Sequence, residues 1–137
     1  MSATRGAPVL EWSAQYEVGI RFMDGQHRQM LDLVNRIVEG VHARLELAEL
    51  TELLRDLVRL TEHHFATEEK QMAEHGADAD AHRGEHRRLV EDLRAFTDRL
   101  DADSVGECSV FLREWLLRHI ESTDRPFAAF LRERGMT

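Results

Sequence analysis

The sequence predicts an all-α fold, an antiparallel up-down four-helix bundle with an N-terminal extended arm and a short C-terminal helix. Apolar residues recur at three- and four-residue steps in four separate stretches, which places them on one face of a helix. The 137 residues include only two prolines, and no stretch alternates as a strand does. The breaks between the four stretches are short, and short connections make neighbouring helices antiparallel.

The N-terminal residues 1–18 contain Gly6 and Pro8 among mixed polar residues, so we expect an extended arm. Its apolar side chains, Leu10 and Trp12, are expected to dock on the body of the protein. The first helix is predicted from about residue 22 to residue 43. Its inward stripe is Met23, His27, Met30, Leu31, Val34, Ile37, Val38 and Val41.

The second helix is predicted to begin near Leu47 and to end at Gly76, because glycine is favoured just past a helix C-terminus. The segment GADAD follows as a break, and Asp78 or Asp80 is the candidate N-cap of the third helix. The apolar stripe of the third helix then continues to Leu100.

The fourth helix is predicted from about residue 107 to residue 122. Pro126 is expected to stop or bend it, because proline lacks the N–H that a helix needs. A short tail helix through Leu131 is expected to follow. We therefore expect one domain over residues 1–137, with an arm at 1–18, a bundle at about 20–124 and a tail at 125–137.

Composition limits the classes of function and of location. The net charge of −8 argues against nucleic acid, whose phosphates need a basic surface. No apolar run approaches the roughly 18 residues that span a membrane, and MSATRGAPVLEW does not resemble a signal peptide. Cys108 is the only cysteine, which fits a reducing compartment. We expect a cytoplasmic protein; its oligomeric state is open, with a monomer favoured.

The chain has eight histidines, and most of them lie on the apolar stripes. In TEHHFATEEK, His64 and Glu68 are four residues apart and share one helix face, which continues the inward leucine stripe. His63 and Glu69 are each rotated by about 100° from that face, so we expect them on a flank or in solvent.

The other helices repeat this arrangement. His82 and His86 are four residues apart on the third helix, His27 is in register with the first stripe, and His119 with the fourth. Asp124 would be about 140° out of line with His119 on a straight helix. It can converge with the histidines only if the chain turns there.

Five inward imidazoles and two inward carboxylates predict a metal site. Each buried polar group without a partner costs about 1–3 kcal/mol, and metal coordination satisfies all of them at once. The donors exceed what one ion takes; structural zinc prefers cysteine, and calcium and magnesium prefer oxygen. Two iron or two manganese ions sharing bridging carboxylates fit this donor set. None of the five inward histidines stands three residues after a glutamate, as the histidines of the Glu-x-x-His pairs in ferritin-like bundles do.

Four segments, GIRFMDGQH, HFATEE, HRGEH and HIESTD, resemble in order and in spacing the motifs of the hemerythrin family. LEWSAQYEVGI resembles the start of its bacterial members, the bacteriohemerythrins. The resemblance implies two non-haem iron ions (Fe2+/Fe3+) joined by an oxo or hydroxo bridge. It implies the metal ligands His27, His64, Glu68, His82, His86, His119 and Asp124.

In the family's arrangement Glu68 and Asp124 bridge the irons. One iron takes His82, His86 and His119. The other takes His27 and His64 and keeps an open position for O2.

The resemblance further implies reversible dioxygen binding by a carrier, a store or a supplier to an oxygen-consuming enzyme. Met30, Phe65 and Leu116 match an apolar oxygen pocket in the family, and plain core packing is the alternative interpretation of these three residues. We expect no enzyme activity. Two alternatives stay open: an oxygen, redox or iron sensing module, and di-iron turnover of peroxide or nitric oxide. The sequence shows no fused segment, which favours a free-standing carrier.

Overall fold

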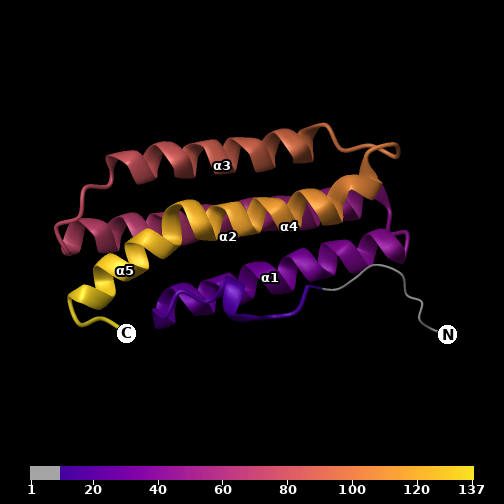
Figure 1. Cartoon of the computed structure of the whole chain (residues 1–137). Helices are drawn as coiled ribbons and strands as arrows, with labels where there is room; N and C mark the ends of the chain where they lie inside the picture. Colours follow the sequence, from indigo (N-terminus) through magenta and orange to yellow (C-terminus); the bar gives the residue numbers. More distant parts are fainter. Residues whose placement is uncertain (1–9) are drawn as a thin grey trace.

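A computed structural model describes residues 10–137, and all regular structure in this part of the chain is helical (Figure 1). The long helices are α1 (Arg21–His42), α2 (Leu47–Glu74), α3 (Asp80–Asp98) and α4 (Cys108–His119), followed by α5 (Arg125–Glu133). Both α1 and α3 pack against α2 and against α4, so the four long helices enclose one core. The predicted four-helix bundle is confirmed.

The end of α2 lies where the sequence predicted it. Gly76 has a φ of +74°, a conformation that glycine adopts without strain. The N–H of Ala77 donates to the carbonyl of Met72 at 2.9 Å, which satisfies one of the last carbonyls of the helix. This turn reverses the chain toward α3.

The start of α3 differs from the prediction of an aspartate N-cap. Ala79 occupies the N-cap position and makes no side-chain cap hydrogen bond. The carboxylate of Asp78 instead accepts the N–H of Asp80 at 3.0 Å. The prediction was wrong because Asp78 closes a local turn ahead of the helix, and Asp80 is already in the first turn.

The N-terminal segment runs beside α1 (Figure 1). Residues 1–9 of the expected arm lie outside the described residues. The backbone N–H and carbonyl of Leu10 each form a 2.8 Å hydrogen bond with the side-chain amide of Asn35, which docks the arm on α1. The arm is not extended throughout, because Ala14–Tyr16 form a 3₁₀ turn, η2, that buries Tyr16.

The fourth helix does not stop before Pro126. A five-residue π-helical segment, η4 (Ile120–Asp124), joins α4 to α5, and Pro126 lies in the first turn of α5. Proline removes a backbone donor and clashes with the preceding turn, and the wider π turn accommodates both effects. Figure 1 shows α5 leaving the direction of α4 at this segment.

Gly84 in the interior of α3 provides a test of local packing. A Cβ atom added there would meet nothing within 4 Å. Gly84→Ala is therefore expected to raise the free energy of unfolding by about 0.5–1 kcal/mol, because alanine restricts the unfolded chain and favours helix. Urea denaturation of the metal-free protein measures this change.

Gly40 in α1 is the matched control. A Cβ atom there would lie 2.8 Å from Leu45 Cδ1 and 3.1 Å from Leu50 Cδ2. Gly40→Ala should not raise the free energy of unfolding, because Leu45 and Leu50 must move to admit the added Cβ atom. A loss of stability in Gly84→Ala would contradict the open packing around Gly84.

Within residues 10–137, none of the helices has the length and apolar character that crossing a membrane requires.

Candidate metal centre

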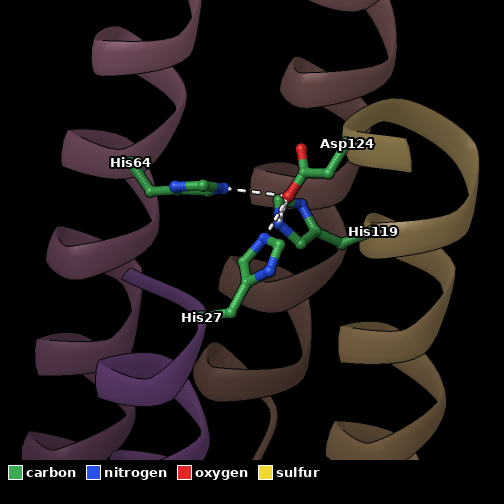
Figure 2. Close-up of side chains that lie close together, drawn as sticks. All are labelled: His27, His64, His119 and Asp124. Atoms are coloured by element: carbon green, nitrogen blue, oxygen red, sulfur yellow. Dashed lines mark hydrogen bonds and ion pairs between the residues drawn. The ribbon is translucent and has the colours of Figure 1, made fainter. Parts of the chain in front are cut away.

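Three imidazoles and one carboxylate meet in the core of the bundle (Figure 2). His27 comes from α1, His64 from α2 and His119 from α4, and Asp124 is the last residue of η4. All four residues are fully buried. Asp124 Oδ2 lies 2.7 Å from His119 Nε2 and 3.1 Å from His64 Nε2, and His27 Nε2 contacts the same oxygen. One atom from each side chain could thus bind a common ion.

A second group shares a member with the first. Glu68, His86 and Asp124 each offer one atom, and these atoms lie within 4.8 Å of one another. Glu68 Oε1 is 3.1 Å from His86 Nε2, and Glu68 Oε2 is 3.1 Å from His64 Nε2. Glu68 therefore contacts an imidazole of each group, and Asp124 belongs to both groups, which is the arrangement that bridging carboxylates need.

The π-helical segment explains how Asp124 reaches the cluster. In a π-helix the hydrogen bonds run from residue i to residue i+5, so residues five apart lie one turn from each other. His119 immediately precedes η4 and Asp124 ends it. The turn that the sequence required at this point is thus a widened helical turn.

Outward-facing partners, which the sequence analysis missed, hold two of the imidazoles. The backbone carbonyl of Tyr16 lies 3.2 Å from His27 Nδ1, and the side-chain oxygen of Gln26 lies 2.5 Å from His64 Nδ1. Because these oxygens only accept, each Nδ1 is the donor, and each Nε2 keeps its lone pair for the interior. Gln26 belongs to the segment GIRFMDGQH, but its partner lies on a different helix, so spacing within that segment could not reveal the pair.

The unpaired polar atoms of the described core are concentrated at this site. Although several of these atoms lie 2.7–3.1 Å from a nitrogen or oxygen of a neighbouring side chain, their contacts lack hydrogen-bond geometry. Apart from Thr61 Oγ1, the buried side-chain atoms that form no hydrogen bond are both carboxylate oxygens of Glu68, His86 Nε2 and both ring nitrogens of His119. Each such atom costs about 1–3 kcal/mol if nothing binds it. A pair of cations would satisfy carboxylate and imidazole donors together, so these residues fit a metal centre.

Electrostatics at the site also favour cations. Burial raises the pKa of Glu68 well above its ordinary value, and the nearby Asp124 raises it further. Burial lowers the pKa of His119 to about 4, so this imidazole is neutral near pH 7 and keeps a free lone pair. Burial alone would raise the pKa of Asp124, but His119, Glu68 and His64 outweigh it and hold the pKa well below its usual range.

Residues 18–131 match the family model described as the hemerythrin HHE cation binding domain. The chain belongs to the hemerythrin family. It is 30% identical over 130 residues to a bacteriohemerythrin of Methylococcus capsulatus, covering 90% of this chain and 97% of that protein. A bacteriohemerythrin of Pseudomonas aeruginosa is 29% identical over 126 residues, covering 90% and 82%. A myohemerythrin of Theromyzon tessulatum is 27% identical over 115 residues, covering 83% and 87%.

Two features differ from the hemerythrin arrangement that the four motifs implied. His119 lies with His27 and His64, because Asp124 Oδ2 gathers all three Nε2 atoms. His82 joins neither group. It is half-buried, and its Nε2 donates to the carbonyl of Thr123 at 2.9 Å, next to Asp124 in the chain.

The three residues that match the hemerythrin oxygen pocket are all buried in the core. The ring of Phe65 stacks on His86, with centroids 3.9 Å apart, and lies 4.9 Å from the ring of His119. Met30 and Leu116 are one helical turn from His27 and His119. This placement is compatible with both a pocket wall and plain packing.

Proposed function

We propose that this hemerythrin-family protein binds dioxygen reversibly at a carboxylate-bridged, non-haem di-iron centre. One observation carries the proposal: two buried donor groups have Asp124 in common, and the buried carboxylate of Glu68 contacts an imidazole of each group. The proposed metal ligands are His27, His64, Glu68, His82, His86, His119 and Asp124. His82 is included on the family motif, and its contact with the carbonyl of Thr123, the residue before Asp124, supports this assignment.

Neutral imidazoles and the two carboxylates have complementary tasks in this proposal. The imidazoles present lone pairs without adding charge, and the carboxylates offset the charge of two cations. The iron pair, when bound, supplies the electrons for reversible dioxygen binding. The outward hydrogen bonds to Gln26 and to the Tyr16 carbonyl keep the ligand rings oriented.

The proposal assigns Met30, Phe65 and Leu116 to the exclusion of water. Their side chains are buried and apolar, and they lie beside or one turn from the imidazoles. Apolar side chains keep water and proton donors away from the bound oxygen. Bound oxygen is then less readily protonated and released in a reduced form, which would leave the irons oxidised. In this role the three residues protect the ferrous state.

The proposed role is that of an oxygen carrier, store or supplier to an oxygen-consuming enzyme, without catalytic turnover of its own. We further propose that residues 1–137 form one domain that acts in the cytoplasm as a monomer. The net charge of −8 supports a monomer, because molecules of like charge repel one another, and it speaks against a nucleic-acid partner.

Stopped-flow spectroscopy tests this function. The protein is loaded anaerobically with ferrous iron and mixed with dissolved oxygen. A visible charge-transfer band should appear, disappear when oxygen is removed, and return over repeated cycles, and the zinc-loaded protein should show no band. Rapid irreversible oxidation with continuing consumption of added peroxide would contradict carriage and favour an enzyme.

A further inference from the structure

A groove of about 530 Å³ opens between α2 and α3 and reaches the site. Its lining includes Phe65, His86 and Glu69, together with the charged side chain of Arg83. The side chain of His86 is only 3% exposed, whereas that of Glu69 is 28% exposed. Glu69 thus lies between solvent and a buried imidazole of the centre.

We propose that Glu69 is a positioning residue that fixes the ring orientation and the tautomer of His86. The inference rests on the proposed function, in which His86 is a metal ligand. Glu69 Oε2 lies 2.9 Å from His86 Nδ1, and a carboxylate accepts the Nδ1–H. The opposite nitrogen, Nε2, then carries the lone pair and faces Glu68 Oε1 at 3.1 Å.

The imidazole of His86 is held on its face as well as on its edge. The ring of Phe65 is parallel to it within 1°, with centroids 3.9 Å apart. On the other side of Glu69, Arg83 Nε lies 3.6 Å from Oε1 and orients that carboxylate. The ring therefore has one stacking partner and one hydrogen-bond acceptor, and the acceptor itself has a charged neighbour.

The Nδ1 partner of His86 differs in charge from the Nδ1 partners of His27 and His64. His27 uses a backbone carbonyl and His64 uses a neutral amide, whereas the Nδ1 of His86 contacts a carboxylate. An anionic acceptor makes the imidazole a stronger electron donor than a neutral acceptor does. Glu69 is therefore expected to strengthen metal binding by His86 without touching the metal.

Three variants test this role: Glu69→Ala removes the acceptor, Glu69→Gln keeps a neutral acceptor, and Glu62→Ala is the matched control. Glu62 lines the same groove two helical turns away, and its carboxylate pairs with Arg94 rather than with a histidine. The first measurement uses the metal-free protein, in which long-range ¹H–¹⁵N NMR assigns the tautomer of His86. The second is competition of each protein with a chelator for cobalt(II).

We expect His86 to be protonated on Nδ1 in the wild type, in Glu62→Ala and in Glu69→Gln, and to lose this preference in Glu69→Ala. Cobalt should bind about 10–100-fold more weakly to Glu69→Ala, and Glu69→Gln should restore part of that loss. Equal tautomers and equal cobalt affinities in the Glu69→Ala and Glu62→Ala proteins would overturn the proposal. Because the NMR measurement needs no iron, a failure of the di-iron function would leave the tautomer result intact, and the two failures are distinguishable.

Discussion

Asp124→Asn is expected to lower the bound iron from two ions per chain to less than one and to abolish the visible charge-transfer band. Asp124 is the residue common to both donor groups, and one of its oxygens gathers the Nε2 atoms of His27, His64 and His119. An amide retains the shape of the side chain but lacks the charge and the second anionic oxygen that bridging requires. Elemental analysis after reconstitution with ferrous iron, together with the optical spectrum, measures the effect.

Two further variants calibrate this result. His82→Ala should lower the iron content by about half, because His82 is proposed to serve one ion only. His63→Ala, an exposed neighbour of His64, should retain both ions. Retention of two irons in a folded Asp124→Asn protein, with wild-type helicity by circular dichroism, would contradict a bridging role.

Glu68→Gln is expected to stabilise the metal-free protein while it removes iron. Glu68 is fully buried, and neither of its carboxylate oxygens has a hydrogen-bond partner. Replacing this buried acid with a neutral isostere should raise the free energy of unfolding at neutral pH by on the order of 1 kcal/mol. The same change removes a bridging ligand, so a gain in stability and a loss of function are expected together.

The pH dependence separates this explanation from a general packing effect. Burial raises the pKa of Glu68 above its ordinary value of 4.5, so the folded state binds a proton more tightly than the unfolded state. The stability that this proton supplies is present in full below pH 4.5 and is lost as the pH rises through the folded-state pKa. The advantage of Glu68→Gln should therefore be larger at pH 8 than at pH 5, measured by urea denaturation of metal-free proteins. A constant or shrinking advantage would be inconsistent with a buried carboxyl group.

The bundle could be predicted from the sequence because its helices are amphipathic over many turns. The predicted first helix, at about 22–43, agrees with Arg21–His42. The end of α2 could be predicted because glycine readily adopts the positive φ that Gly76 has just past this helix. Such local signals need no tertiary information. The prediction of an aspartate N-cap for α3 was wrong, because Asp78 can close a turn as readily as it can cap a helix. Only the folded chain decides between these two uses.

The site could be predicted in its residue types but not in its pairings. Helical periodicity predicted the inward direction of His64 and Glu68, and both are buried. Periodicity could not reveal that Glu69, on the flank of α2, reaches His86 on α3, because that contact joins two helices. Likewise the convergence of Asp124 depends on the π-helical segment, a departure from the regular spacing on which the sequence argument was built.

The most direct test of the central claim is an anomalous difference map, recorded at the iron edge from crystals grown with ferrous iron. Two peaks are expected inside the bundle, close together, with the carboxylates of Asp124 and Glu68 each in contact with both. A single peak, or peaks away from these two carboxylates, would contradict the shared-carboxylate di-iron centre and with it the proposed binding of oxygen.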